Sequence, residues 1–452
     1  MPDKFHFECV DCKTEYPGDK VLYLCPACEK LNQPDRPPRG VLKTIFPYQQ
    51  IRKLSPDERL FGHLERDHFL PLMPLRDMKS WPLLKIGDTP LYQIGRRTRG
   101  PVDRRASGQA DKRTSGPVDK QASGQAGRFM ESLNFELYLK DDSRNPTFSF
   151  KDRASALVSA WAKENGIETL VAASTGNAGS SLAGVCASQR QRAMIVVPAA
   201  APLAKLTQIL MYGATLVAVK GTYDDAFDLS VKISEKYGFY NRNTAYNPLT
   251  IEGKKTVSFE LFRQLGYHVP DRIFIPVGDG VIYAGVCKGF EDLLKLGIIE
   301  RMPVLVAVQA EGSSNLVNNL KSSSFIAKSS KTIADSISVD VPKCFHMAVG
   351  YMDEYQGEAV SVSDKEILQA SLLLSRSTGI FSEPAAVAAF AGMLKYHDKG
   401  MIQAQSTNVV LLTGSGLKDL SAVQSSIRIP DPVGPDIDSV EELIQKNFSQ
   451  TS

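Results

Sequence analysis

Residues 145–181 read NPTFSFKDRASALVSAWAKENGIETLVAASTGNAGSS and contain, in order, a loop, a helical pattern, an apolar run and a turn of small residues. Apolar residues from Ala154 to Trp161 recur at helical spacing, so we expect Lys151 to begin a helix. The run TLVAAS (169–174) is short and apolar, which is typical of a strand buried on both faces. This succession predicts a βαβ unit built around a parallel sheet.

Short apolar runs separated by helical stretches continue on both sides of this segment. They are FELYLK (135–140), AMIVVP (193–198), ATLVAVK (214–220), DRIFIPVG (271–278), PVLVAVQAEG (303–312) and NVVLLTGSG (408–416). Strands that alternate with helices in this way favour parallel sheets, and the two series predict two α/β layers. Ligands of such folds bind at the carboxyl ends of the strands, where several Gly-rich turns of this chain fall.

Four of the seven cysteines lie within the first 28 residues, in the spacing C-x2-C-x12-C-x2-C, and they are Cys9, Cys12, Cys25 and Cys28. Two such pairs present four thiolates in a tetrahedral arrangement, which predicts a structural zinc ribbon without an open coordination position. Two disulfides are the alternative, but the cytosol would keep them reduced. We interpret the other three cysteines, Cys186, Cys287 and Cys344, as buried, inert thiols.

The composition is that of a globular protein with small ligands. The chain has 452 residues, 43% of them hydrophobic, and a formal net charge of +3. Its basic residues form no stripe, which argues against a nucleic-acid partner, and no apolar window is long enough for a membrane span. The charge distribution favours small anionic ligands as partners. The N-terminus lacks the layout of a signal peptide, so we expect a cytoplasmic protein.

Two segments interrupt the regular pattern. QPDRPPRG (33–40) has paired prolines and reads as a link between modules. Residues 96–128 repeat GPVD and ASGQA with almost no apolar side chains, which predicts a disordered surface insertion. We therefore expect a zinc ribbon over 1–35, a larger domain made of 36–150 and 246–440, and a smaller α/β domain over 151–245.

Four motifs, each directly after a predicted strand, resemble the threonine synthase family of pyridoxal-phosphate (PLP) enzymes over roughly residues 80–420. NPTFSFKDR resembles the NPTGSFKDR signature of that family, and STGNAG (174–179) resembles its cofactor loop. VGDGVIYAG (277–285) resembles its cofactor-phosphate loop, and TGSGLKD (413–419) resembles its TGHGLKD segment. Some members also carry a four-cysteine ribbon. The resemblance implies a fold-type II, tryptophan synthase beta-like α/β fold with two domains.

The resemblance also implies roles for individual residues. Lys151 would hold PLP as a Schiff base and move protons, Asn177 would contact the 3′-oxygen of the cofactor, and Thr413 would lie beside its pyridine nitrogen. The cofactor phosphate would lie against Gly278, Gly280 and Val281. A neutral hydroxyl at the ring nitrogen suits elimination and replacement better than transamination.

Two departures from the family motifs concern the cofactor site. Phe148 replaces the glycine of NPTGSFKDR, and we expect it to crowd or reshape the turn before the lysine. Asp279 stands where asparagine is commoner. A carboxylate beside a phosphate is unfavourable unless it faces a backbone amide, a cation or solvent.

A third departure concerns the substrate. NTAYNPLTIEGKKT (243–256) resembles a family segment NSxNPxRIEGQKT, whose Asn, Ser and Arg help bind the substrate phosphate. These three positions are Thr244, Ala245 and Thr250 here. A hydroxyl cannot replace the charge and fork geometry of arginine, which argues against O-phosphohomoserine as the substrate. Lys254 and Lys205 are the candidates for a compensating cation, and a solvated helix face is the alternative, and the favoured one, for each of them.

The expected function is that of a PLP-dependent, threonine synthase-like lyase that eliminates or replaces a group at the β or γ carbon of an amino acid. Conversion of O-phosphohomoserine to threonine is the nearest activity, and cysteate synthase-like replacement or threonine or serine dehydration are the alternatives. A regulatory protein that kept the fold is a further alternative, against which Lys151, Asn177 and Thr413 argue. The absence of a basic stripe argues against a nucleic-acid-binding module. For the oligomeric state, a homodimer is an open alternative.

Overall fold

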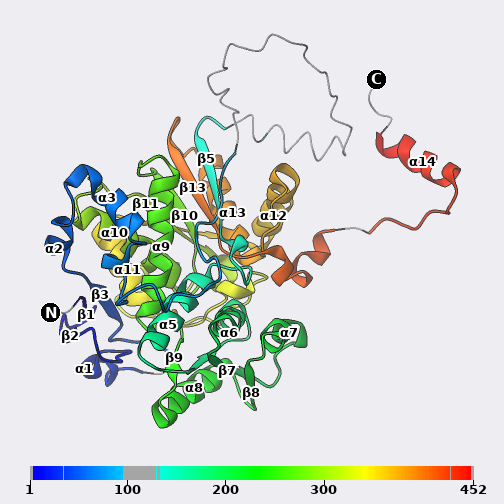
Figure 1. The fold of residues 1–452 in the computed structure, drawn as a ribbon. Coiled ribbons are helices and arrows are strands. Elements are labelled where there is room, and N and C mark those ends of the chain that lie inside the picture. The colour runs from blue at the N-terminus through cyan, green and yellow to red at the C-terminus, as the bar shows by residue number, and fades with distance from the viewer. Residues whose placement is uncertain (1–3, 34, 95–128, 130–132, 428, 449–452) are drawn as a thin grey trace.

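The computed structural model describes residues 4–33, 35–94, 129, 133–427 and 429–448, and the predicted insertion at 96–128 lies outside them. Within the described residues, the strands form three sheets that helices surround (Figure 1). The two larger sheets position the candidate site. The third belongs to the N-terminal ribbon.

The largest sheet has six strands, and five of them are parallel. Its strands in spatial order are β12 (Glu358–Val362), β11 (Val304–Ala310), β10 (Arg272–Pro276), β13 (Thr407–Leu412), β5 (Glu136–Asp141) and β4 (Leu91–Ile94). The edge strand β4 is antiparallel to β5. The strands predicted at 135–140, 271–278, 303–312 and 408–416 are therefore confirmed, and all four lie in this sheet.

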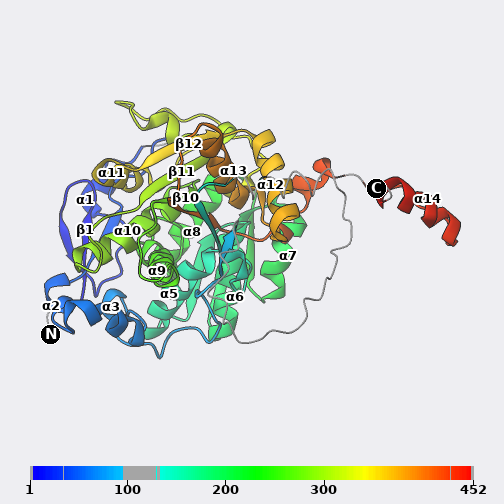
Figure 2. The same ribbon diagram turned by 90° about the horizontal axis from the view of Figure 1, so that it is seen from above.

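Helices cover both faces of this sheet (Figure 2). On one face, α10 (Val281–Lys295) packs against the strands, α9 (Leu249–Gln264) packs on α10, and α5 (Lys151–Glu164) packs on α9. On the other face, α13 (Pro384–Asp398) packs against the strands and α12 (Asp364–Thr378) packs on α13. Strand β10 shows the alternation, because Ile273 and Ile275 join the first core whereas Phe274 joins the second. This two-sided burial explains the continuous apolar sequence of β10.

A second, four-stranded parallel sheet comes from the middle of the chain. Its strands in spatial order are β8 (Thr215–Val219), β7 (Arg192–Pro198), β6 (Thr169–Ala173) and β9 (Tyr240–Asn241). Its helices are α6 (Asn177–Gln189), α7 (Leu203–Met211) and α8 (Tyr223–Tyr237). One face of the sheet packs against α8 through Ala226 and the other against α6 through Leu182.

The helices between the two sheets approach each other closely. Helix α9 packs along both α5 and α10. A Cβ atom at Gly289 of α10 would lie 2.6 Å from the Cβ of Ser258 on α9, so only glycine allows this approach. The tight packing fixes the start of α10 relative to the start of α5.

The N-terminal ribbon is a three-stranded antiparallel sheet with strands β2 (Glu15–Pro17), β1 (His6–Cys9) and β3 (Leu42–Ile45), and a short helix α1 (Pro26–Glu29). Strand β3 lies beyond the predicted 1–35 segment. Helices α2 (Tyr48–Arg52) and α3 (Asp57–Arg66) follow it.

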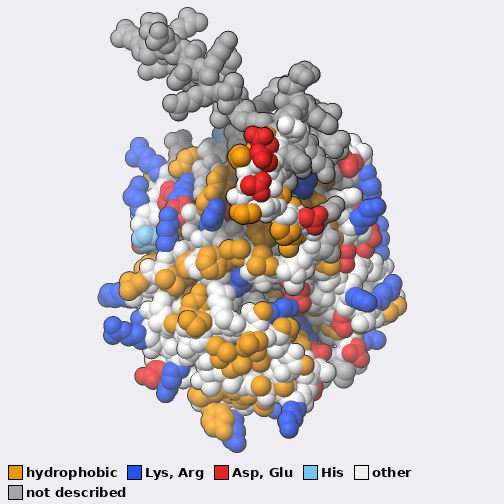
Figure 3. Space-filling model, turned by 90° about the vertical axis from the view of Figure 1, so that its right-hand side faces the viewer, with side chains coloured by type: hydrophobic (Ala, Val, Ile, Leu, Met, Phe, Trp, Pro, Cys, Tyr) orange, Lys and Arg blue, Asp and Glu red, His pale blue; other side chains and the backbone are white. Residues whose placement is uncertain are grey.

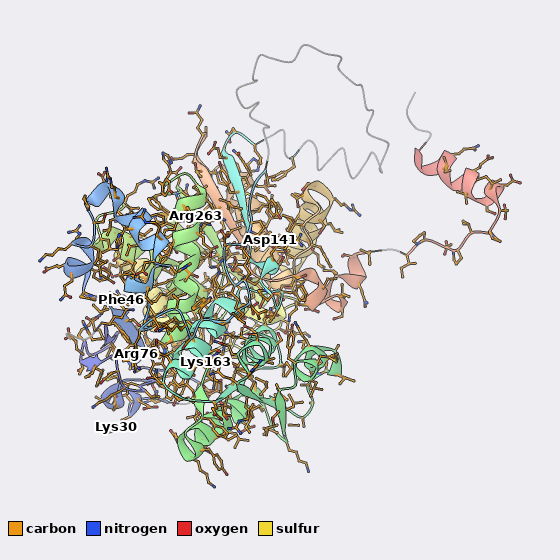
Figure 4. The ribbon with its side chains drawn as sticks, viewed as in Figure 1. Lys30, Phe46, Arg76, Asp141, Lys163 and Arg263 are labelled. Carbon is orange, nitrogen blue, oxygen red and sulfur yellow. The ribbon has the colours of Figure 1, made fainter. Side chains whose placement is uncertain are left out.

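Buried charges join the ribbon to the main body. Lys43 on β3 donates to Glu291 on α10 at 2.6 Å. Next to this pair, Lys255 Nζ lies 4.1 Å from the centre of the Phe46 ring and 2.7 Å from Asp292. Figure 4 labels Phe46, which follows β3. A buried charge that lost its partner would be strongly unfavourable, so these contacts hold the ribbon in one position.

The remaining helices are α11 (Phe345–Tyr355), which packs on α10, and α14 (Ile437–Phe448), which lies apart from the main body (Figure 1). On the face shown in Figure 3, positive and negative side chains are interspersed. Among the described residues, no helix has both the length and the apolar character that crossing a membrane requires.

Candidate active site

A cavity of about 920 Å³ lies at the carboxyl ends of β6 and β10. Residues 174–178 after β6 and residues 277–282 after β10 line it, together with Lys151 and parts of the segment 325–343. Its position is the one that parallel α/β sheets use for ligands. Its volume is large enough for a cofactor and a small substrate together.

Lys151 is the first residue of α5 and lines this cavity. Burial lowers the pKa of its amine. The nearby Glu383 carboxylate raises that pKa, while the Arg242 guanidinium lowers it further. The net lowering leaves more of the amine neutral than in a solvated lysine, and a neutral amine is the form that attacks a carbonyl or accepts a proton.

The turn before Lys151 places Phe148 in the left-handed region, with φ of 68°. Its N–H donates to the Asn145 carbonyl at 2.8 Å, and its carbonyl accepts from the Ser415 N–H at 3.1 Å. The Phe148 side chain is 47% exposed, so the expected crowding of the turn is not observed. Phenylalanine adopts the backbone that glycine favours, at a cost in strain.

Asn177 is the first residue of α6 and is buried at the cavity wall. Its Nδ2 lies 2.9 Å from Oε1 and 3.0 Å from Oε2 of Glu383, the residue that precedes α13. Burial raises the pKa of Glu383, whereas Lys151 and the Asn177 hydrogen bond lower it. Asn177 and Glu383 therefore form a buried hydrogen-bonded pair, and the charges of Glu383 and the half-buried Lys151 act on each other.

The loop from β10 to α10 carries Gly278 and Gly280, and both residues line the cavity. Gly280 has φ of 86°, and a Cβ at Gly278 would lie 2.9 Å from the Cα of Ile337. Val281 begins α10, whose first amides have no acceptor within the helix and favour an anion. The Asp279 carboxylate accepts from the Lys343 N–H at 3.0 Å, so it does face a backbone amide.

Thr413 follows β13 and is buried, but it is not among the residues that line the cavity. Its carbonyl accepts from the Phe150 N–H at 2.8 Å, next to Lys151. Ser149 and Gly414 form a β-bridge beside it. The structure thus brings the predicted residues Lys151, Asn177 and Thr413 together from three segments of the chain.

Known proteins that resemble this chain are PLP enzymes, which agrees with the chemistry of the cavity residues. Residues 125–414 match the family described as "Pyridoxal-phosphate dependent enzyme". The chain belongs to this enzyme family. The matched range covers more than half of the sequence. It includes the first three motifs in full and the first two residues, Thr413 and Gly414, of the fourth.

Similar curated relatives of this PLP enzyme are threonine synthases. The threonine synthase of Methanocaldococcus jannaschii is 30% identical over 97% of this chain and 99% of its own length. The threonine synthase of Methanosarcina acetivorans is 32% identical over 97% of this chain and 98% of its own length. The threonine synthase of Halalkalibacterium halodurans is 38% identical over 66% of this chain and 82% of its own length. The chain is therefore a threonine synthase-like PLP enzyme.

Solved structures show the same fold. The O-ureido-L-serine synthase structure matches with a TM-score of 0.58 and 20% identity, covering 76% of this chain and 95% of that chain. Threonine deaminase isoform 2 from Solanum lycopersicum matches with a TM-score of 0.56 and 22% identity, over 70% and 88%. The predicted fold-type II α/β architecture is confirmed.

The cavity residues fit PLP chemically. PLP has an aldehyde, which requires an amine, and a phosphate, which requires converging N–H donors. The cavity offers the Lys151 amine, with its lowered pKa, and the start of α10 beside two glycines. Glycine at these positions keeps side-chain atoms away from a bound anion.

The segment 243–256 differs from the family pattern in a way that the structure explains. The Thr250 hydroxyl donates to the Asn247 carbonyl at 2.7 Å and accepts from the Ala245 N–H at 3.3 Å, so it stabilises its own turn. Lys254 lines the cavity as one of the two expected compensating cations. Lys205 does not line it and pairs with Asp335 at 2.7 Å, so that alternative is wrong.

Two charged residues of the site, Glu383 and Arg242, were not predicted from the sequence. Glu383 precedes a proline and a long apolar helix, and a lone acid beside such a buried run was a usable signal. Arg242 follows the two-residue strand β9 and also lines the cavity. Its own neighbours in the sequence are polar, so no pattern marked it as buried.

The four N-terminal cysteines form a second candidate site. Their Sγ atoms all lie within 4.8 Å of one another, with Cys9 to Cys28 at 3.7 Å and Cys12 to Cys25 at 3.6 Å. A disulfide would need about 2.05 Å, so these are free thiols. Four sulfurs about 2.3 Å from a tetrahedral zinc would lie about 3.8 Å apart, close to the observed separations.

Proposed function

We propose that this PLP enzyme converts O-phosphohomoserine and water into threonine and phosphate. The threonine synthase relatives that match almost the whole chain support this reaction. The observation that carries the proposal is the position of Lys151. Its amine lies in the same cavity as Asn177 and the glycine loop of α10.

The proposed residue roles follow from these positions. When bound, PLP withdraws electrons from the carbon that carries the substrate amine. The start of α10, with Gly278, Gly280 and Val281, would hold its phosphate, and Lys151 would hold its aldehyde carbon. Asn177 and Thr413 would orient the ring from two sides.

Lys151 is also the proposed proton carrier. Its lowered pKa favours the neutral amine, which is the form of Nζ that would accept a proton from a substrate carbon. The Glu383 carboxylate stabilises the ammonium that results, since it raises the same pKa. The proton would return to the γ carbon after the phosphate leaves, and water would add at the β carbon.

Zinc in the ribbon is a second proposal. The sulfur–sulfur separations are close to those around a tetrahedral zinc ion. Four cysteine ligands, Cys9, Cys12, Cys25 and Cys28, would leave no open coordination position, which supports a structural ion. Such thiolates persist in a reducing compartment, which supports a cytoplasmic enzyme.

A substrate panel tests the proposed reaction. The holoenzyme is incubated with O-phosphohomoserine, O-phosphoserine, threonine and serine, and phosphate, threonine, pyruvate and 2-oxobutyrate are measured. Threonine and phosphate in equal amounts from O-phosphohomoserine are the expected result. Turnover of threonine or serine to a keto acid alone would show a dehydratase and contradict the proposal.

A further inference from the structure

Arg242 is a buried cation that forms no ion pair within the described residues. Burial lowers its pKa to about 10, although the charge of nearby Asp152 acts in the opposite direction. Arg242 is fully buried, and its Nε donates to the Ser155 hydroxyl at 3.1 Å. Its Nη2 is buried and has no hydrogen-bond partner among the described residues. An unpaired buried guanidinium is costly, and proteins keep such costs mainly at functional sites.

Lys254 is a second cation in the same cavity. Its Nζ makes only neutral contacts in the described structure, with the Thr250 carbonyl at 3.2 Å and the Thr244 hydroxyl at 3.5 Å. Burial lowers the pKa of Lys254, and the charges of Arg242 and Lys151 lower it further, which shows that the three cations are near one another.

Five acidic residues line the cavity, and they are Asp35, Asp224, Asp279, Asp335 and Asp340. Asp279 is near enough to raise the pKa of Lys254, but within the described residues none of the five forms an ion pair with Arg242 or Lys254. Asp279 accepts from the Lys343 backbone, and Asp335 pairs with Lys205 at 2.7 Å. Asp224 is 78% exposed and lies 3.6 Å from Lys343. A cavity wall with two unpaired cations attracts an anion, most strongly one with several oxygens.

We infer that Arg242 and Lys254 form a subsite for a tetrahedral oxyanion of the phosphate class that the amino-acid substrate carries. This inference rests on the proposed function and names its substrate class. Arg242 then supplies, from the end of β9, the guanidinium that position 250 lacks. The holoenzyme would contain a second phosphate group, which is part of the cofactor. The start of α10 would bind that group.

Binding of inorganic phosphate to the holoenzyme tests the subsite. Phosphate is titrated while the cofactor absorbance and the melting temperature are recorded. We expect Arg242→Gln to weaken phosphate binding about tenfold or more, because a hydrogen-bonded charge pair is lost. Arg242→Lys keeps the charge without the fork and should lie in between. The matched control Arg192→Gln, at a 73% exposed surface arginine, should bind as the wild type does.

Stability separates this role from a structural one. Without phosphate, Arg242→Gln should melt at the same or a higher temperature than the wild type, since it removes an unpaired buried charge. A structural arginine would instead lower the melting temperature. Lys254→Gln gives an independent variant, expected to weaken phosphate binding as well.

The outcomes distinguish the two possible sources of the anion and the two proposals. Unchanged phosphate affinity in both Arg242→Gln and Lys254→Gln would overturn the subsite. Loss of cofactor from these variants, with phosphate affinity restored by added PLP, would assign the cations to the cofactor and also overturn it. Arg242-dependent phosphate binding without turnover of O-phosphohomoserine would support the subsite and contradict the proposed reaction.

Discussion

The Nδ2 atom of Asn177 lies 2.9 Å and 3.0 Å from the two carboxylate oxygens of Glu383. These residues come from α6 beside the four-stranded sheet and from the start of α13 behind the six-stranded sheet. Glu383 also raises the pKa of Lys151. One buried carboxylate thus links both layers to the candidate catalytic amine.

Replacing Glu383 by Gln should lower the pKa of Lys151 further, because the charge that favours the ammonium is lost. The neutral amine then appears at lower pH. The rate at which the apoenzyme takes up PLP is measured against pH, and its midpoint should move to lower pH. An unchanged midpoint would mean that Glu383 is already protonated in the apoenzyme and would contradict this account.

Gly280→Ala should destabilise the fold and weaken cofactor binding. Its φ of 86° strains any other residue, and the new Cβ would lie 3.1 Å from the Cβ of Ala348. A loss of about 1 kcal/mol or more in unfolding free energy is expected from chemical denaturation. Gly238→Ala, with φ of 68° in open space, is the matched control. It should lose stability but keep its affinity for PLP, and an equal loss of affinity in both would contradict the loop assignment.

Phe148→Gly should stabilise the protein slightly, by up to about 1 kcal/mol, because relief of left-handed strain exceeds the entropy that glycine adds to the unfolded chain. Phe148→Ala keeps the strain and should show no gain. Denaturant unfolding measures both. A marked destabilisation by glycine would show that the exposed ring makes a contact that matters.

The ribbon should contain one zinc ion per chain. Removal by a strong chelator, or Cys9→Ser, should lower the melting temperature, because the ribbon packs on α10 through Lys43 and Glu291. Elemental analysis and thermal denaturation measure this. A metal-free protein with an unchanged melting temperature would contradict the zinc assignment.

The buried strands were predictable from sequence, and so was the half-exposed edge strand β8, whose run ATLVAVK is apolar. The edge strands β12 and β9 were not. Strands such as β6 and β10 consist mainly of apolar residues, and such a short apolar run predicts a buried strand. Strand β12 reads EAVSV and is mostly half-buried, while β9 has only two residues. Their pairing depends on neighbouring strands, which no local pattern contains.

The site residues that belong to a local sequence motif were predictable. Lys151, Asn177 and the glycine loop stand in such motifs after strands. Arg242 and Glu383 act through contacts with distant segments, such as Ser155 and Asn177. Lys205 was misjudged for the same reason, since its partner Asp335 lies 130 residues away in the chain.

The most direct test of the central claim is to identify the lysine that carries PLP. The holoenzyme is reduced with borohydride, which fixes the cofactor to the amine, and its peptides are analysed by mass spectrometry. We predict the label on Lys151, with no cofactor absorbance in Lys151→Ala. Lys254 is the discriminating alternative, because it lines the same cavity and its pKa is also lowered. A label on Lys254, or cofactor bound as before in Lys151→Ala, would contradict the account.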